Sequence, residues 1–258
     1  MEDKFLKVAK QAAVEAGKVI MSFYGQDHKL MIKTDHTDFA TQADLAAEKT
    51  IVGIITKNFP SHNIIAEEKV RINNRSTFTW AIDPVDGTIS FASKMPFFAV
   101  SIGLLENNQP VLGVIYHVTQ NDLYWAEIGK GAYLNGRKIA VSKTNKLKNS
   151  VIGLGIGGMS RRKDKLKNYF YPLLEKVRYI YMLGGGAVSL AFVARGFLDA
   201  LPNTAWIWDQ AAGGIIITEA GGKVSDRSGN PVDWSADKAE CIASNGLVHN
   251  EVLEALKK

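Results

Sequence analysis

The chain reads Phe78-Thr79-Trp80-Ala81-Ile82-Asp83-Pro84-Val85-Asp86-Gly87-Thr88-Ile89-Ser90-Phe91 near the end of its first third, and this stretch predicts a sheet strand that leads into an acidic turn. Its first five residues form a short run that is rich in aromatic and β-branched side chains, as in a buried strand. Pro84 fixes φ and has no N–H, and Gly87 permits backbone conformations that other residues resist, so the chain turns after the strand. The turn places two carboxylates at the strand's exit.

These two carboxylates, Asp83 and Asp86, predict a metal site. Like charges held a few ångströms apart are costly unless a cation lies between them, and hard oxygen ligands select Mg²⁺, Mn²⁺ or Ca²⁺. The N–H groups of Gly87 and Thr88, with the Thr88 hydroxyl, can hold a phosphate oxygen, a water molecule or the metal. Asp-Pro and Asp-Gly also occur in ordinary solvated turns. The full order strand, Asp, Pro, hydrophobe, Asp, Gly, Thr is more specific and favours the metal site.

The composition is that of a globular protein with a large core, since 46% of the 258 residues are hydrophobic and 22% are charged. Lysines are spread through residues 1–24, so we expect no signal peptide, and no apolar run approaches transmembrane length. Cys241 stands alone, which excludes an intramolecular disulfide and favours a cytoplasmic location. The five histidines are scattered, so we expect no zinc site.

The net charge of +5 favours small anionic ligands without identifying one. The densest basic segment, residues 161–167, lacks the interleaved aromatic residues of a nucleic-acid interface, so we interpret it as a solvated helix start. It is also compatible with a place beside a substrate that carries several phosphates. We therefore expect a small phosphorylated partner and neither a nucleic acid polymer nor a membrane.

The first half of the chain predicts two helices and an antiparallel-rich sheet. Apolar residues at helical spacing indicate a helix over residues 3–24. A second helix is expected from Thr41, whose capping box with Asp44 places that carboxylate in the first turn, to Pro60. The dipeptide Asn135-Gly136 indicates a hairpin. Strands are expected at residues 63–65, 78–82, 97–106, 110–117 and 122–127.

The second half changes to alternating helices and strands, which is typical of an α/β sheet. Strands are expected at residues 151–155, 178–183, 198–201, 222–225 and 240–244, and helices at residues 163–176, 186–196, 208–220 and 247–257. We place the boundary between an α+β half, 1–145, and an α/β half, 146–258. Neither a linker nor a repeat separates them, so we expect one compact unit.

A second acidic signature, Trp208-Asp209, precedes a helix of small residues, so its carboxylate either caps this helix or points into a shared cleft. Glu219-Ala220-Gly221-Gly222 follows it, and Ala66-Glu67-Glu68 stands at the end of an earlier strand. Together with residues 38–44 and 83–91, these pieces resemble the inositol monophosphatase family of Mg²⁺-dependent, Li⁺-sensitive phosphatases. The resemblance spans nearly the whole chain.

The resemblance implies an α-β-α-β-α layered sandwich, commonly a homodimer, that binds two to three Mg²⁺ ions. Mn²⁺ would be an alternative metal, and Ca²⁺ and Li⁺ would inhibit. The implied metal ligands are Glu67, Asp83, the Val85 carbonyl, Asp86 and Asp209. The implied catalytic residues are Asp44 and Thr88, which orient and deprotonate the attacking water, together with Glu67. The implied substrate-binding residues are Asp86, Gly87, Thr88, Gly184, Gly185, Gly186 and Asp209.

Phosphate monoesters suit such a site, because their uncatalysed hydrolysis is extremely slow and clustered Mg²⁺ ions both acidify a bound water and neutralise the leaving alkoxide. Inositol-1-phosphate is the substrate that the resemblance favours. Ser90 stands where the family usually has Asn, and Pro202-Asn203-Thr204 offers no acid where many inositol phosphatases have a sugar-binding Glu. NADP(H), fructose 1,6-bisphosphate, histidinol phosphate and 3′-phosphoadenosine 5′-phosphate are alternatives, and these departures favour a larger or more anionic substrate.

Two other functions are compatible with paired acids after a strand. A haloacid-dehalogenase-type phosphatase needs Asp-x-Asp with a nucleophilic first Asp, whereas Asp83 and Asp86 have the spacing Asp-x-x-Asp. A metal- and phosphate-binding sensor without turnover would lack a ligand or the water activator, yet the implied ligands and Asp44 are all present. The sequence therefore favours a metal-dependent phosphatase.

Overall fold

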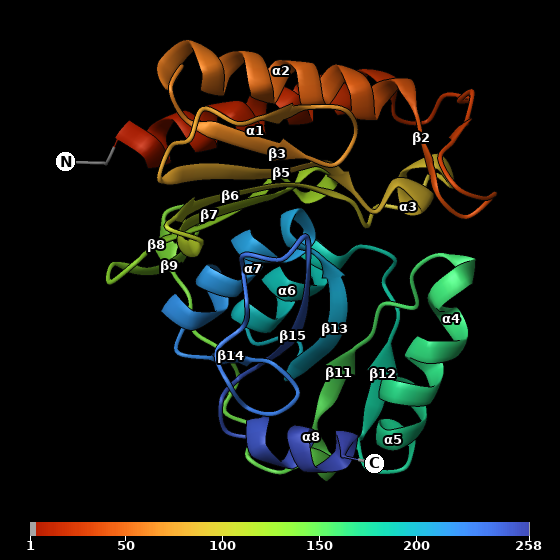
Figure 1. Cartoon of the computed structure of the whole chain (residues 1–258). Coiled ribbons are helices and arrows are strands. Elements are labelled where there is room, and N and C mark those ends of the chain that lie inside the picture. The colour runs from red at the N-terminus through yellow and green to blue at the C-terminus, as the bar shows by residue number, and fades with distance from the viewer. Residues whose placement is uncertain (1–3, 258) are drawn as a thin grey trace.

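The computed structural model describes residues 4–257 as alternating layers of helix and sheet (Figure 1). Its helices are α1 (Lys4–Phe23), α2 (Gln42–Asn58), α3 (Thr88–Ala92), α4 (Met159–Lys165), α5 (Tyr171–Leu174), α6 (Gly186–Ala194), α7 (Ile207–Glu219) and α8 (His249–Leu256). Helices α1 and α2 cover the outer face of the first sheet, α6 and α7 lie between the two sheets, and α4, α5 and α8 lie beyond the second sheet. The expected α-β-α-β-α sandwich is confirmed.

The first sheet is antiparallel except at one pair of strands. Its strand order is β10 (Arg137–Lys138), β9 (Gly131–Leu134), β8 (Asp122–Glu127), β7 (Gln109–His117), β6 (Ala99–Glu106), β5 (Phe78–Asp86), β3 (Asn63–Ala66) and β4 (Arg71–Ile72). Only β3 and β5 run parallel. The expected strand 78–82 is too short, because β5 continues to Asp86 through a register shift between Asp83 and Asp86. The two acids therefore lie within the bulged end of a strand and not after it.

The second sheet mixes parallel and antiparallel pairs in the order β12 (Tyr179–Tyr181), β11 (Val151–Gly153), β13 (Ala200–Trp206), β15 (Lys238–Ser244) and β14 (Lys223–Ser225). The expected strand 198–201 is wrong in its bounds, because Pro202-Asn203-Thr204 lies inside β13. Proline is tolerated there because β11 pairs with β13 only at Ala200, which leaves that edge open at Pro202. All strands of this sheet follow residue 146, but the proposed division into halves 1–145 and 146–258 stays a prediction.

The helix expected at 163–176 begins earlier and is interrupted. Helix α4 starts at Met159, a π-helical segment spans Leu166–Phe170, and α5 follows. Pro172 has no N–H to offer the Asn168 carbonyl, and Arg227 Nη2 donates to that oxygen instead at 3.1 Å. The partner lies 59 residues away in the sequence, so local periodicity could not reveal it.

Glycines let α7 approach both its neighbours closely. A Cβ at Gly113 of β7 would lie 2.4 Å from the Ala212 carbonyl oxygen, and a Cβ at Gly213 would lie 2.4 Å from Leu190 Cδ1 of α6. Only hydrogen fits at such distances, so these two positions fix how near α7 sits to the first sheet. The first turn of α7 is thereby held against the end of β5.

A buried polar cluster lies in the second sheet, at its contact with α8. We name it the Ser–His cluster and define it as Ser225, Ser244 and His249. His249 is fully buried, and its Nε2 and Nδ1 each lie 2.8 Å from a serine Oγ, of Ser225 and Ser244 respectively. Burial, aided by the charge of Lys223, lowers the pKa of His249 to about 4, so the ring is neutral. The hydroxyls also bond to the backbone, since Ser225 Oγ donates to the Asp226 carbonyl at 2.7 Å and Ser244 Oγ accepts the Gly246 N–H at 3.1 Å. The ring and both hydroxyls thus find their partners within the fold, and the cluster holds β14, β15 and α8 together. Separately, none of the helices within residues 4–257 is both long and apolar enough to cross a membrane.

Candidate active site

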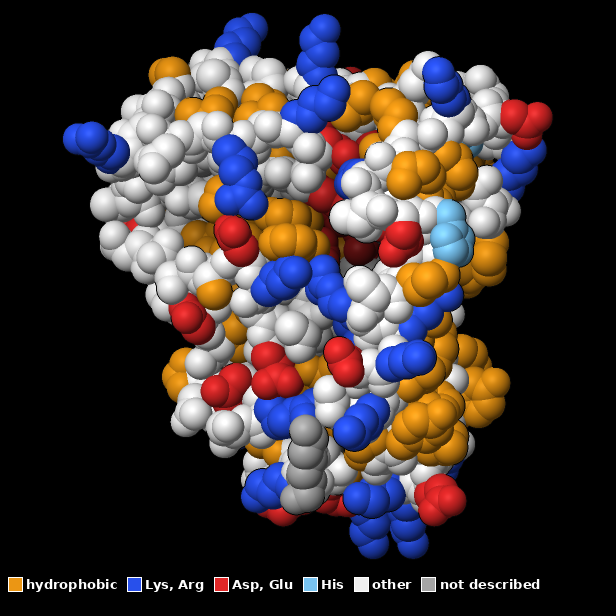
Figure 2. Space-filling view, turned by 45° about the vertical axis from the view of Figure 1, so that its right-hand side comes forward, with side chains coloured by type: hydrophobic (Ala, Val, Ile, Leu, Met, Phe, Trp, Pro, Cys, Tyr) orange, Lys and Arg blue, Asp and Glu red, His pale blue; other side chains and the backbone are white. Residues whose placement is uncertain are grey.

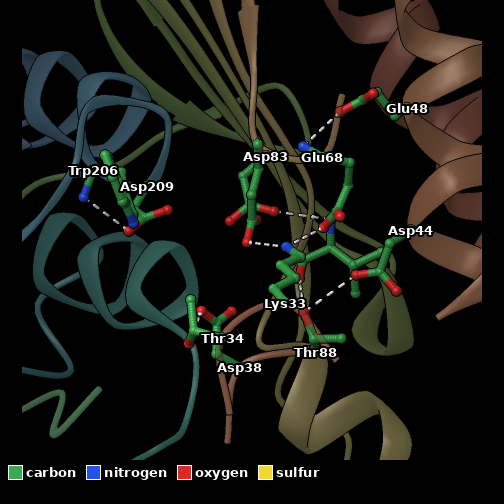
Figure 3. Close-up of polar contacts among 12 residues, drawn as sticks. Lys33, Thr34, Asp38, Asp44, Glu48, Glu68, Asp83, Thr88, Trp206 and Asp209 are labelled. Atoms are coloured by element: carbon green, nitrogen blue, oxygen red, sulfur yellow. Dashed lines mark hydrogen bonds and ion pairs between the residues drawn. The ribbon is translucent and has the colours of Figure 1, made fainter. Parts of the chain in front are cut away.

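Five carboxylates reach one region from four elements, and Figure 3 labels three of them, Asp44, Asp83 and Asp209. Asp83 and Asp86 lie at the end of β5, and Glu67 directly follows β3. Because β3 and β5 run parallel, their carboxyl ends meet at the same edge of the sheet. Asp44 lies in the first turn of α2 and Asp209 in the first turn of α7, so the helix layers on both sides of the first sheet contribute.

Glu67, Asp83 and Asp209 form the tightest group, with one carboxylate oxygen from each within 4.8 Å of the others. Asp83 is 2% exposed, and Glu67 and Asp209 are partly exposed towards a cavity. Burial, followed by the charge of Glu67, raises the pKa of Asp83 and of Asp209 well above the ordinary range. Three hard oxygen donors that repel one another at this distance fit a divalent cation such as Mg²⁺ or Mn²⁺.

Asp86 lies beside this group but already has two backbone partners. Its Oδ1 accepts the Gly186 N–H at 2.9 Å and its Oδ2 accepts the Ala187 N–H at 2.7 Å, at the start of α6. Burial raises the pKa of Asp86 to about 7 although these hydrogen bonds oppose the shift. A Cβ at Gly185 would lie 2.8 Å from Asp86 Oδ2, so the glycine run permits this approach. We define the acidic cluster as Glu67, Asp83, Asp86 and Asp209.

Thr88 and Asp44 contact each other across the sequence. Thr88 Oγ1 lies 3.2 Å from Asp44 Oδ1 and 3.2 Å from the Val85 carbonyl oxygen, and its single proton serves one of them at a time. Asp44 Oδ2 accepts the N–H of Thr41 at 2.8 Å and its hydroxyl at 2.5 Å, which is the expected capping box. Asp44 is fully buried, and burial raises its pKa against these hydrogen bonds.

Gly87 turns the chain from β5 into α3. Its φ of 94° is in the left-handed region, and a Cβ would lie 2.7 Å from the Phe97 carbonyl oxygen, so the position requires glycine. The amides of Gly87 and Thr88 stand at the start of α3, where N–H groups have no acceptor within the helix. They line the cavity together with Asp86.

Lys33 is a site residue that the sequence did not reveal. It lies in the hairpin between β1 (Met31–Ile32) and β2 (Phe39–Ala40), and its Nζ lies 2.9 Å from Glu67 Oε1 and 2.6 Å from Glu68 Oε1. Burial acts to lower the pKa of Lys33, but the charges and hydrogen bonds of the two glutamates outweigh it and raise the pKa. Lys33 belongs to no sequence motif, so no pattern in the sequence predicts this contact.

A cavity of about 410 Å³ opens over the acidic cluster. Figure 2 shows the hollow near the middle of one face, with acidic side chains at its base and Lys and Arg side chains along its lower edge. The expected site residues that line it are Glu67, Asp86, Gly87, Thr88, Gly184, Gly185, Gly186 and Asp209. Arg162 and Lys165 of the basic segment 161–167 and Asn203 of the segment 202–204 also line it, although the sequence did not reveal which residue of each segment faces the cavity. The lining residues that the sequence did not reveal at all include Gly155, Gly157 and Gly158.

Comparison with known proteins gives a family match over the whole chain. A family model described as "Inositol monophosphatase family" matches residues 1–258. The chain is 38% identical to the inositol-1-monophosphatase of Synechocystis over 98% of its own length and 88% of that protein. It is 35% identical to a protein of Aquifex aeolicus named fructose-1,6-bisphosphatase/inositol-1-monophosphatase, over 99% of this chain and 96% of the relative.

Solved structures agree. The extragenic suppressor protein suhB of Bartonella henselae superposes with a TM-score of 0.92 at 33% identity, over 99% of both chains. The inositol monophosphatase of Anabaena superposes with a TM-score of 0.86 at 35% identity, over 98% of this chain and 94% of that one. Both the fold and the sequence therefore point to the same group of proteins.

Proposed function

Because this chain belongs to the inositol monophosphatase family and is a phosphoric monoester hydrolase, we propose that it hydrolyses inositol-1-phosphate in a Mg²⁺-dependent reaction. The observation that carries the proposal is the meeting of three carboxylates within 4.8 Å beside the Asp44–Thr88 contact. Bound Mg²⁺ would lower the pKa of a coordinated water and offset the charge that grows on the leaving oxygen.

We assign the metal to the acidic cluster and the Val85 carbonyl. Two to three Mg²⁺ ions would be held there, with Mn²⁺ as a substitute and Ca²⁺ and Li⁺ as inhibitors. Asp83 is the most buried member of the acidic cluster, and one of its carboxylate oxygens lies within 4.8 Å of an oxygen of both Glu67 and Asp209, which suits a shared ligand. The donors are all hard oxygens, which supports Mg²⁺ over softer metals.

The remaining residues position and deprotonate the water and hold the phosphate. Thr88 Oγ1 is within hydrogen-bond distance of Asp44, so a proton taken from water by the hydroxyl can pass to the carboxylate. Burial raises the pKa of Asp44, so its carboxylate is a better proton acceptor than an exposed aspartate. The amides of Gly87 and Thr88, which line the cavity, would donate hydrogen bonds to the phosphate oxygens.

A phosphate-release assay tests the proposal. Purified protein should release phosphate from inositol-1-phosphate with Mg²⁺, release none after chelation by EDTA, and be inhibited by added Li⁺. Fructose 1,6-bisphosphate, NADP⁺, histidinol phosphate and 3′-phosphoadenosine 5′-phosphate complete the panel. Absence of release from all five esters with either Mg²⁺ or Mn²⁺ would overturn the proposal.

Fructose 1,6-bisphosphate is the second candidate substrate. The relatives from Aquifex aeolicus and Thermotoga maritima, each 35% identical, carry both activities in their names. The cavity of this chain has Asn203 and Lys165 in its lining, so its far end is polar and cationic instead of acidic. This chemistry suits a substrate with more negative charge than inositol-1-phosphate.

We also propose a cytoplasmic homodimer. Apolar side chains gather on the lower right of the face in Figure 2. The exposed large apolar side chains of α5, β12 and the residues beside them are Tyr171, Leu174, Tyr179, Tyr181 and Met182. Strand β12 is an edge of its sheet, and a second copy would cover it. Light scattering after size-exclusion chromatography should give twice the mass of 28.3 kDa, and a monomer at micromolar concentration would contradict this.

A further inference from the structure

Lys165 is a buried lysine that faces the cavity without an acidic partner. The residue is 9% exposed, and its Nζ donates to Asn203 Oδ1 at 2.7 Å. Within residues 4–257 this is the one hydrogen bond of its ammonium group, and no carboxylate forms an ion pair with it. An ammonium group has three donors, so two are left for a molecule in the cavity.

A buried ammonium group with no carboxylate beside it is costly for the fold. Burying a charge without a counter-charge is unfavourable, and Asn203 supplies a dipole but no charge. Burial, followed by the charge of Arg161, lowers the pKa of Lys165 to about 8, against the attraction of Asp209. The group is therefore mostly charged at pH 7, and an anion in the cavity would offset the cost.

The chain around Lys165 leaves room for that anion. A Cβ at Gly157 would lie 3.4 Å from Lys165 Nζ, and a Cβ at Gly155 would lie 3.8 Å from the Asn203 side-chain amide. Side chains at these positions would fill the space beside the lysine. Arg162 lines the same part of the cavity, and its Nε donates to the Gly157 carbonyl at 3.4 Å. We name Arg162, Lys165 and Asn203 the basic end of the cavity.

We propose that the basic end binds a second phosphate, carried by the alcohol part of the substrate, so that the enzyme prefers a sugar bisphosphate to inositol-1-phosphate. The inference rests on the proposed function, in which the acidic cluster holds the phosphate that is cleaved. Water adds to that phosphorus, its ester P–O bond breaks, and the alcohol leaves with a proton and with its second phosphate intact. The two ends of one cavity would thus bind the two phosphates through different cations, metal ions at one end and the side chains of Lys165 and Arg162 at the other.

Lys165→Met tests this, because methionine keeps the length and apolar stem and removes the charge. We expect kcat/KM for fructose 1,6-bisphosphate to fall about 10- to 100-fold, mainly through KM, as a charge-assisted hydrogen bond is lost. The value for inositol-1-phosphate should stay within about 2-fold, because that ester has no second phosphate for the basic end. Lys163→Met, an exposed lysine of the same helix α4, is the matched control and should change neither value.

A second variant covers the case in which Lys165→Met does not fold. Asn203→Asp is nearly isosteric and places a carboxylate against Lys165 Nζ, so it neutralises the charge with the lysine still in place. It should raise KM for the bisphosphate and weaken inhibition by fructose 6-phosphate, which carries only the second phosphate. Equal effects of both variants on the two esters, or no effect on either, would overturn this inference alone. A wild-type protein that cleaves neither ester would overturn the proposed function as well.

Discussion

The acidic cluster and the Ser–His cluster are both buried and polar, but only one of them is satisfied from within. In the Ser–His cluster each ring nitrogen of His249 has a serine hydroxyl, and no net charge is present. In the acidic cluster three carboxylates within 4.8 Å repel one another, and of these three only Glu67 bonds to Lys33, whose ammonium group it shares with Glu68. A polar group that is complete within the fold stabilises the fold, whereas one that is incomplete needs something from outside.

The two clusters also respond to pH in opposite directions. The pKa of Asp83 and that of Asp209 are raised, so the folded metal-free protein binds protons more tightly there than the unfolded chain, and acidification stabilises it. The pKa of His249 is lowered, so the unfolded chain binds that proton more tightly, and acidification destabilises the fold. Strongly perturbed carboxylates that open onto a cavity are typical of functional sites, and a closed neutral histidine is not.

The largest expected effect separates activity from stability in the acidic cluster. Asp83→Asn should lower Mg²⁺-dependent phosphate release by roughly 10³-fold or more, because bound metal ions contribute several kcal/mol to catalysis. The metal-free variant should unfold at the wild-type temperature or above it, since one repelling charge is gone. Mg²⁺ should raise the unfolding temperature of the wild type and not of the variant.

Asp27→Asn removes an exposed acid and serves as the control for Asp83→Asn. It should retain both the activity and the response to Mg²⁺. Wild-type turnover by Asp83→Asn would show that the metal assignment is wrong. The acidic cluster would then not need a cation from outside, and it would no longer differ from the Ser–His cluster in that respect.

A smaller effect is expected next to the acidic cluster. Thr88→Ala removes the hydroxyl that contacts Asp44 and should lower kcat roughly 10²-fold, the usual range for one proton-transfer group, with KM little changed. Thr88→Ser keeps the hydroxyl and should recover most of the rate. Steady-state kinetics on inositol-1-phosphate measure both parameters, and a change in KM alone would contradict a role with the water.

The smallest effect concerns the Ser–His cluster and should spare activity. Between pH 7 and pH 5, protonation of His249 in the unfolded chain should cost the wild type about 2 kcal/mol of stability, given a folded pKa of about 4. His249→Gln has no proton to gain, so the difference in stability between wild type and variant should shrink by that amount on acidification. Urea unfolding at both pH values measures it, and the carboxylates contribute equally to both proteins. A difference that does not change with pH would refute the neutral buried ring.

Much of the fold and part of the candidate site could be predicted, because the relevant residues are neighbours in the sequence. Asn135 and Gly136 have φ of 48° and 81°, the two positive values that a type I′ hairpin turn requires. Residues 83–88 bring the acids at the bulged end of β5, the glycine turn and the hydroxyl into one contiguous segment. Local sequence determines local backbone, and here the local backbone places the side chains.

What the sequence could not predict depends on distant pairs. Lys33 finds Glu67 34 residues away, and Lys165 finds Asn203 38 residues away. The lysines of 161–167 all appear alike in the sequence, yet only Lys165 becomes buried, because the helix starts at Met159 and turns that position inwards. The packing of the layers decides which basic residue lines a cavity. The periodicity of residues within one element does not predict that packing.

The contacts of Asp86 limit which substitutions the chain can tolerate at that position. Its two oxygens hold the first amides of α6, a nine-residue helix that begins 100 residues further along the chain, and the same carboxylate is a proposed metal ligand. Asparagine would give up one acceptor oxygen, glutamate would overreach the glycine run, and alanine would release the helix altogether. Each of these substitutions at position 86 therefore disturbs the helix. Among the described residues Asp83 has a single backbone partner, the Val85 N–H, which its Oδ1 accepts at 3.0 Å, and asparagine would keep that acceptor, so a descendant that had abandoned catalysis could carry asparagine at position 83.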